Sequence, residues 1–165
     1  MQSQAFAKCV QLWGGRPEQM RYVPNWAKTP AVAIGQTENQ EPEWLRDLPK
    51  GFKIIFAGNI GKAQDMPTVL RAAELLKDTQ DLHWILVGDG SDYDFVLKTR
   101  QEKKLEHCVH TYGRRPNEDM AALFAKGDVM LVSLTDEPIF SLTVPSKVQA
   151  YMASGKPILA SIRGE

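Results

Sequence analysis

The stretch KIIFAGNIGKAQD, residues 53–65, decides the fold class because it joins an apolar run to a helical pattern through a glycine turn. Gly58 and Gly61 follow the run, and a helix is predicted to begin at Met66. Many α/β proteins hold phosphates at such a turn between a strand and a helix. The stretch does not match the P-loop pattern, and Asn59 stands where the dinucleotide fingerprint has its second glycine. The turn therefore predicts either a phosphate ligand or a turn that needs glycine only for packing.

Strand and helix alternate from this stretch to the end of the sequence. The predicted strands are nearly continuous apolar runs, as expected of strands buried on both faces; they cover Lys53–Ala57, Leu82–Val87, His107–Tyr112, Asp128–Leu134 and Pro157–Ser161. The predicted helices between them cover Met66–Lys77, Tyr93–Lys104, Asn117–Ala125 and Ser146–Ala153. Because such alternation implies parallel strands joined by right-handed crossovers, the sequence predicts a doubly wound, Rossmann-like α/β sheet in three layers.

The ends of two helices have recognisable signals. Asp65 is predicted to cap the helix that begins at Met66, with Pro67 at an early helical position where its missing N–H costs nothing. The last helix is predicted to begin near Pro145 and to end at Gly155.

The sequence outside the sheet predicts a short helix and a linker. Ser3–Trp13 has helical spacing, and residues 27–51 lack periodicity and are rich in Pro, Glu, Gln and Thr, so they are predicted to form a linker or surface loop. The sheet domain would then cover residues 52–165. Because the sequence stops directly after a strand, we expect an incomplete domain with a bare sheet face near Pro157–Ile162. A second copy would cover that face in a homodimer.

Composition excludes several classes of protein. The chain has 165 residues, with 20 Lys plus Arg and 20 Asp plus Glu, so its formal charge of zero argues against a nucleic-acid binder. No apolar run approaches the roughly 20 residues of a membrane span, and no signal peptide is recognisable at the start. Cys9 and Cys108 form no motif. These features predict a cytoplasmic globular protein.

Ligands of open parallel sheets bind at the carboxyl ends of the strands, so the loops there carry the candidate site. Three of these loops open with glycine; the residues of interest are Gly58, Asn59, Gly61 and Lys62 in the first, Gly88, Asp89 and Gly90 in the second, and Gly113, Arg114 and Arg115 in the third. Lys147, early in the last helix, would add positive charge. Together these loops favour a phosphorylated or nucleotide ligand. Each charged residue has a plain alternative as a solvated side chain, and Asp89 has one as a helix cap.

Other site chemistries find no support in the sequence. No set of His, Cys, Asp and Glu has the spacing of metal ligands, and no nucleophile elbow is visible. His83, His107 and His110 are interpreted as structural histidines at strands. The tryptophans are interpreted as packing residues, although Trp44 has an alternative role in covering a domain junction.

Five segments resemble one family. YVPNWA, FAGNIGKAQDMPTVLRAAELL, WILVGDGSDYDFV, HTYGRRPNEDMAALFAKGDVMLVSL and VPSKVQAYMASGKPILAS are similar, in this order, to the C-terminal domain of family 4 glycosyltransferases of the GT-B fold. The similarity is closest to bacterial O-antigen and capsule enzymes that transfer N-acetylated amino sugars such as N-acetylfucosamine, and PSKVQAYMASGKPI is its most specific part.

The resemblance implies a retaining transferase that takes its sugar from a nucleotide-diphosphate sugar, most simply a UDP-sugar, without a metal cofactor. Residues 1–26 would be the last helix of a separate acceptor domain and the passage from it. The acceptor would be a glycan or lipid-linked saccharide, and the full-length protein would be cytoplasmic or peripheral to the inner membrane.

The resemblance also implies roles for individual loops. Gly58 and its neighbours would lie beside the diphosphate and the sugar, and Arg114 and Arg115 near the base. The segment that faces sugar, diphosphate and ribose would include Phe140, Ser141, Leu142 and Lys147.

The sequence departs from the family pattern at four positions. Asn59 and Gln64 stand where many members have an arginine and a lysine for the diphosphate, and Leu142 and Ala150 stand where many have two glutamates. Lys62 and Lys147 are candidates to compensate, and the catalytic residues stay unassigned.

Two other functions compete with this interpretation. The first is a stand-alone nucleotide-binding or regulatory module without catalysis. An NAD-dependent oxidoreductase is disfavoured because the third fingerprint glycine is missing, and Asp89 falls too late after its strand for a ribose contact.

Overall fold

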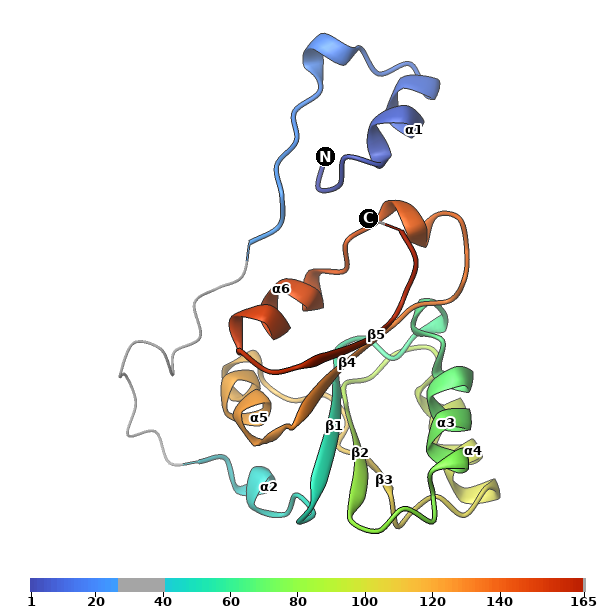
Figure 1. The fold of residues 1–165 in the computed structure, drawn as a ribbon, viewed down its shortest axis with the longest axis vertical. Coiled ribbons are helices and arrows are strands. Elements are labelled where there is room, and N and C mark those ends of the chain that lie inside the picture. The colour runs from blue at the N-terminus through green and yellow to red at the C-terminus, as the bar shows by residue number, and fades with distance from the viewer. Residues whose placement is uncertain (27–40, 165) are drawn as a thin grey trace.

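A computed structural model describes residues 1–26 and 41–164 (Figure 1). Its strands are β1 (Phe52–Ala57), β2 (Leu82–Val87), β3 (Val109–Thr111), β4 (Val129–Ser133) and β5 (Ile158–Ser161). Its α-helices are α1 (Phe6–Leu12), α2 (Glu43–Arg46), α3 (Met66–Leu75), α4 (Tyr93–Glu102), α5 (Met120–Lys126) and α6 (Ser146–Ala153).

The five strands form one parallel sheet in the order β3-β2-β1-β4-β5. The chain moves outward from β1 through β2 to β3, then crosses to β4 on the other side of β1. The strand order therefore reverses between β1 and β4. Ligands of open α/β sheets bind at such a switch point.

The pairing of β1 is complete on one side and short on the other. With β2 it extends from Phe52 to Ala57, whereas with β4 it covers only Ile54 and Ile55. The carboxyl ends of β1 and β4 consequently separate, which opens the sheet at its switch point.

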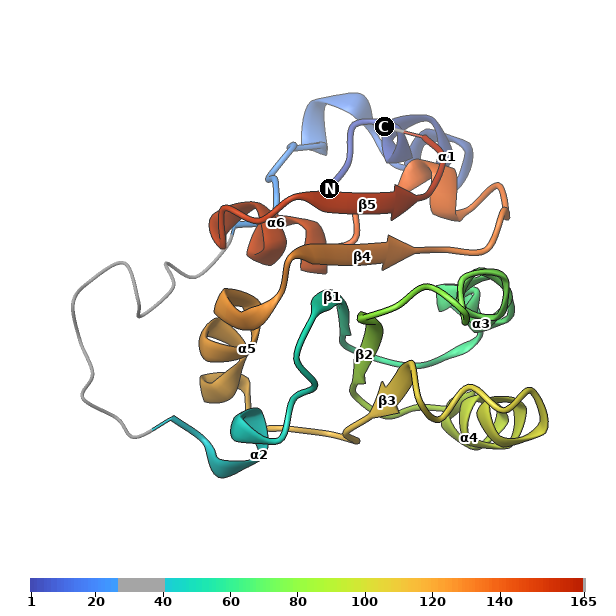
Figure 2. The ribbon, with the colours of Figure 1, turned by 60° about the horizontal axis from the view of Figure 1, so that its bottom comes forward.

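The central strands β1, β2 and β4 are buried on both faces, which confirms the predicted three-layer, doubly wound fold. Ile54 and Phe56 of β1 face α3 and α4, while Ile55 and Ala57 belong to a second core with α2, α5 and α6 (Figures 1 and 2). This alternation follows from the two-residue period of a strand and explains why the strands are continuous apolar runs.

Residues 41–51 pack against the sheet domain, although the sequence predicted a linker or surface loop there. Leu45 of α2 is only 2% exposed and lies in the core beside Ile55. Two adjacent apolar residues, Trp44 and Leu45, in a four-residue helix leave no periodicity to detect. The remainder of the predicted linker, residues 27–40, lies outside the described residues.

The predicted boundaries differ at several points. The strand expected at 107–112 is limited to β3, with Cys108 buried just before it. The helix expected from Asn117 begins as a 3-10 turn and continues as α5.

Asp65 is the N-cap residue of α3, as predicted, but its side chain does not cap the helix. Asp65 has φ 48° and makes no side-chain cap bond, because a 3-10 turn at Lys62–Gln64 reverses into α3 through a left-handed residue. Aspartate tolerates this conformation better than most residues.

The first 26 residues lie beyond the carboxyl ends of the strands, next to the loop before α6 (Figure 1). Phe6 and Val10 of α1, with Thr143 and Val144, line a small apolar cavity of about 260 Å³. Within the described ranges, no helix has the length and apolar character needed to cross a bilayer.

Candidate functional site

The switch point is held open by a tyrosine from α6. The Tyr151 hydroxyl accepts a hydrogen bond from the Ala57 N–H at 2.9 Å and donates one to the Ala57 carbonyl at 3.1 Å. β4 would occupy both groups if the ladder continued, and Tyr151 is 1% exposed. Burial raises the Tyr151 pKa to about 12, so the hydroxyl stays neutral. Ala57 immediately precedes Gly58, so this contact fixes the start of the glycine turn.

Two of the predicted glycines are required by backbone packing. A Cβ on Gly88 would lie 1.8 Å from the Gly58 carbonyl oxygen, and one on Gly90 would lie 2.5 Å from the Ile60 carbonyl oxygen. Both glycines also have positive φ, of 138° and 153°. Close packing between neighbouring loops, which the sequence analysis gave as the alternative to a phosphate ligand, therefore explains why Gly88 and Gly90 are glycines.

Gly58 differs from these two glycines because a Cβ added to it would meet a side chain and not the backbone. Its φ is 142°, and a Cβ there would approach only the end of Lys147, at 3.5 Å from Nζ. Its N–H bonds the Val87 carbonyl at 2.9 Å, which ties the turn to β2. The open side of Gly58 thus faces the head of α6.

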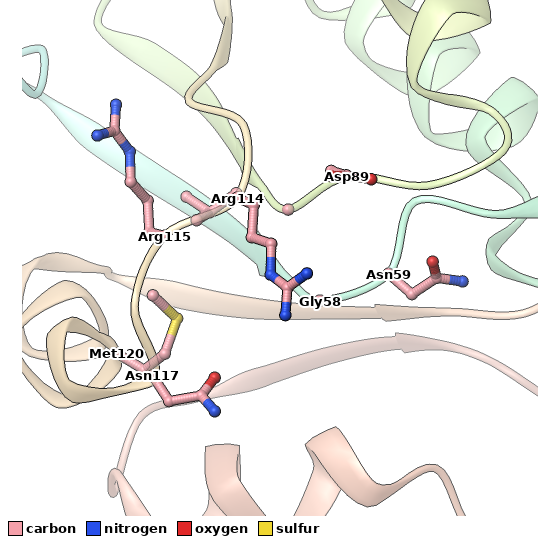
Figure 3. A pocket seen from close by; sticks show the side chains of 9 residues that line it. Gly58, Asn59, Asp89, Arg114, Arg115, Asn117 and Met120 are labelled. Carbon is pink, nitrogen blue, oxygen red and sulfur yellow. The ribbon is translucent and has the colours of Figure 1, made fainter.

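A first hollow of about 310 Å³ opens on one side of Gly58. It is lined by residues from the three glycine loops and the start of α5: Gly58, Asn59, Val87, Gly88, Asp89, Arg114, Arg115, Asn117 and Met120. Figure 3 shows that the Arg114 side chain extends toward Gly58, whereas the Arg115 side chain turns away from it.

Arg115 is held by contacts outside this hollow. Its Nε donates to the Tyr112 carbonyl at 3.0 Å, and its guanidinium lies 4.9 Å from the centre of the Trp44 ring. The Trp44 indole in turn donates to Asp119 at 2.8 Å. Of the two arginines that the sequence predicted near a base, Arg114 is therefore the one available to a ligand. Arg115 instead packs its loop against Trp44 of α2.

A second hollow of about 540 Å³ opens on the other side of Gly58, in the split between β1 and β4. Its lining comes from the β1 loop, the end of β4 and the head of α6: Ala57, Gly58, Asn59, Ala63, Gln64, Leu134, Phe140, Thr143, Pro145, Ser146, Lys147 and Ala150. Among these lining residues, Lys147 is the single charged side chain. The two hollows share Gly58 and Asn59.

The Lys147 ammonium is enclosed by the protein. It donates a hydrogen bond to Oε1 of Gln64, and it lies 3.8 Å from the centre of the Phe56 ring. Burial lowers the Lys147 pKa to about 8, because desolvation disfavours the charged form. Lys147 remains mostly protonated at neutral pH and presents a poorly solvated cation to the hollow.

Other predicted residues lie farther from the two hollows. Lys62 is exposed and lines neither. Gly61 and Gly113 shape the backbone, the latter by accepting a 2.8 Å bond from the Gly88 N–H. Ser141 donates to the Pro138 carbonyl at 2.7 Å, and neither Ser141 nor Leu142 lines the second hollow, although Phe140 does.

The histidines take no part in either hollow. His83 and His110 bond each other at 3.1 Å between ring nitrogens, and burial lowers the His110 pKa to about 4. In the part of the chain that the structure describes, no group of three or more His, Cys, Asp or Glu is placed to hold a metal ion.

Comparison with known proteins identifies the family. Residues 30–165 match the family model described as glycosyl transferases group 1. The chain belongs to the group 1 glycosyl transferases. This membership decides against the oxidoreductase. A relative in Pseudomonas aeruginosa, probable glycosyltransferase WbjE, is 34% identical to this group 1 domain in a 149-residue alignment that covers 87% of the chain. The chain spans 35% of the length of that relative.

Solved glycosyltransferases share the fold of this group 1 domain. WaaG, a glycosyltransferase involved in lipopolysaccharide biosynthesis, has a TM-score of 0.77 and 15% identity, over 99% of this chain and 44% of its own. Anabaena Alr3699/HepE in complex with UDP-glucose has a TM-score of 0.75 and 21% identity over the same shares. The Rossmann-like α/β fold therefore matches that of GT-B glycosyltransferases.

Proposed function

We propose that this chain is the donor-binding, C-terminal domain of a retaining glycosyltransferase. The enzyme would transfer a sugar from a nucleotide-diphosphate sugar to a glycan or lipid-linked acceptor in bacterial polysaccharide biosynthesis, as in the O-antigen or capsule. The observation that carries this proposal is the pair of hollows that meet at Gly58 and Asn59, at the switch point of the sheet.

The two hollows suit the two ends of such a donor. The nucleoside would lie in the first hollow beside Arg114, Asn117 and Met120, and the sugar in the second. The diphosphate that joins them would cross Gly58, whose open side and neighbouring Lys147 accommodate an anion. HepE, with the same fold, is known with UDP-glucose, which supports a uridine nucleotide.

The lining of the second hollow favours a sugar with apolar groups. Leu134, Phe140 and Ala150 contribute aliphatic and aromatic surface there, and the lining residues in the described ranges include no carboxylate. Acetamido methyl and deoxy carbons pack against such surface better than hydroxyl groups, which need hydrogen-bond partners. An N-acetylated, deoxygenated amino sugar therefore fits better than a fully hydroxylated hexose.

The chemistry of this half would be electrostatic. When the bond between the anomeric carbon and the β-phosphate oxygen breaks, negative charge grows on the leaving diphosphate. The Lys147 ammonium and the turn at Gly58 would stabilise that charge without a bound metal. The acceptor would come from a separate domain, of which residues 1–26 would be the final helix.

Calorimetric titration tests the proposal directly. UDP, GDP and ADP are titrated into the chain, and UDP-N-acetylglucosamine and UDP-glucose are then compared, each with and without EDTA. We expect UDP to bind more tightly than GDP and ADP, with the same affinity in the presence and absence of EDTA. UDP-N-acetylglucosamine should bind more tightly than UDP-glucose. Equal weak binding of all three diphosphates would contradict the proposal.

Two further parts of the proposal concern assembly and place in the cell. The outer strand β5 has an exposed face that includes Leu159, at 49% exposed, and a second copy would cover it. Monomeric elution at micromolar concentration would contradict a homodimer.

For the full-length enzyme we propose a cytoplasmic position, peripheral to the inner membrane, which fractionation of cells would test.

A further inference from the structure

The Lys147 ammonium is a half-buried cation whose charge no ion pair compensates within the described part of the chain. It donates a hydrogen bond to the amide oxygen of Gln64 and lies over the face of the Phe56 ring. An ammonium has three N–H donors, and Gln64 uses one of them. Burying a charge without an opposite charge costs free energy, and proteins retain such an arrangement where a ligand supplies the missing charge.

The position of this cation is set from two sides. On the helix side, Tyr151 lies one turn after Lys147 on the same face of α6 and binds Ala57, so α6 is fixed next to Gly58. On the loop side, Gln64 ends a 3-10 turn whose backbone is held by two bonds. The Gln64 N–H donates to Gly61 at 2.8 Å, and the Ala63 carbonyl accepts from the Thr135 N–H at 3.0 Å.

We propose that Lys147 is the cation that binds the β-phosphate of the donor, and that Gln64 is the residue that positions it. The charge thus comes from α6, across the split between β1 and β4, and the loop after β1 supplies only a neutral amide. This inference rests on the proposed function, because it assigns the diphosphate contact within the same site.

The geometry makes an exchange test possible. Because the two side-chain ends touch, a lysine at position 64 would place its ammonium close to where Lys147 now has it, with a glutamine at 147 as the neutral partner. The double variant Gln64→Lys/Lys147→Gln therefore moves the charge to the other side of the split and keeps it in the hollow. Lys156→Gln is the matched control, since Lys156 also donates to a protein oxygen, that of Ala125 at 2.9 Å, but precedes the amino end of β5, whereas the hollows lie at the carboxyl ends of the strands.

The experiment is calorimetric titration of each variant with UDP and with UMP, which lacks the β-phosphate. In Lys147→Gln we expect UDP affinity to fall by about 10-fold or more, and UMP affinity to change by less than about 3-fold. The exchanged double variant should regain UDP affinity to within about 3-fold of the wild type. Gln64→Leu, which keeps the cation and removes its partner, should lose part of the preference for UDP over UMP. Lys156→Gln should bind both as the wild type does.

The outcomes separate this inference from the proposed function. If the wild type prefers UDP over UMP and Lys147→Gln keeps that preference, the inference is overturned and the donor site stands. If Lys147→Gln loses the preference but Gln64→Leu keeps it in full, the positioning role of Gln64 is overturned, and a folded double variant that does not regain the preference contradicts the exchange of charge across the split. If the wild type binds no nucleotide diphosphate, both fail together.

A measurement on the wild type covers the case in which a variant does not fold. The lysine ammonium resonances are recorded by NMR at about pH 6, where exchange is slow, during addition of UDP and then UMP. We expect UDP to shift the Lys147 resonance more than UMP does. An unshifted Lys147 resonance at saturating UDP would overturn the inference.

Discussion

The Tyr151 hydroxyl satisfies both backbone hydrogen-bonding groups of Ala57, two residues after the last residue of β1 that pairs with β4. This contact lets the sheet split at its switch point without leaving buried backbone groups unpaired. It also places α6 against the glycine turn, so the fold and the candidate site depend on the same hydroxyl.

Removing that hydroxyl should therefore weaken both stability and ligand binding. In Tyr151→Phe the Ala57 N–H and carbonyl lose their partner while they remain buried, which costs about 1–3 kcal/mol. We expect a fall of several degrees in the midpoint of thermal unfolding and weaker UDP binding. Tyr22→Phe is the control, since Tyr22 is 47% exposed. An unfolding midpoint equal to that of the wild type in Tyr151→Phe would contradict this account of the split.

Gly88 should tolerate alanine much less well than another glycine with positive φ. The Cβ of Gly88→Ala would meet the Gly58 backbone oxygen, whereas a Cβ on Gly155 has no atom within 4 Å although its φ is 69°. Urea unfolding should show a loss of about 1 kcal/mol for Gly155→Ala and of at least about 2–3 kcal/mol for Gly88→Ala. Equal losses would show that φ alone, and not the approach of the two loops, determines the cost.

Lys147 should lower the stability of the free protein at neutral pH. Its pKa of about 8 lies below the ordinary 10.5, so the unfolded chain binds more protons between these values and the wild type gains stability as pH rises through them. At pH 7 the free energy of unfolding, measured with urea, should be about 1–3 kcal/mol higher for Lys147→Met than for the wild type. This difference in free energy should be smaller at pH 10. Lys156→Met serves as control. A less stable Lys147→Met at pH 7 would contradict this assignment.

The two neighbouring arginines should separate into a ligand contact and a structural contact. Arg114→Gln should weaken UDP binding by about 5- to 10-fold and leave unfolding unchanged, because its exposed guanidinium faces the first hollow. Arg115→Gln removes the bond to Tyr112 and the contact with Trp44, and it should cost about 1–2 kcal/mol of stability with a smaller change in UDP affinity. Titration and thermal unfolding of both variants give the comparison, and the opposite pattern would contradict it.

The sequence was sufficient for the sheet and insufficient for the contacts at its switch point. Short apolar runs bounded by turn residues, such as Leu82–Val87, are typical of buried parallel strands, and the first two strands lie almost where expected. Pro145 likewise indicates the start of α6, and so places Lys147 correctly near the head of that helix.

Contacts between distant residues leave no local pattern. Gln64 and Lys147 are 83 positions apart, and Ala57 and Tyr151 are 94 apart, so no spacing rule connects them. The stack of Arg115 on Trp44 was hidden for the same reason. Gly88 was ambiguous because a turn that holds a phosphate and a turn that packs on a neighbouring loop need the same residue.

The central claim is that two hollows joined at Gly58 bind the two ends of one donor. Backbone amide NMR of the chain, titrated with UDP and then with UDP-N-acetylglucosamine, tests it most directly. Both ligands should shift the amides of Gly58, Asn59 and Arg114, and only the sugar nucleotide should also shift those of Thr143 and Ser146. If both ligands perturb the same amides, or if neither perturbs Gly58 and Asn59 at millimolar concentration, the claim is contradicted.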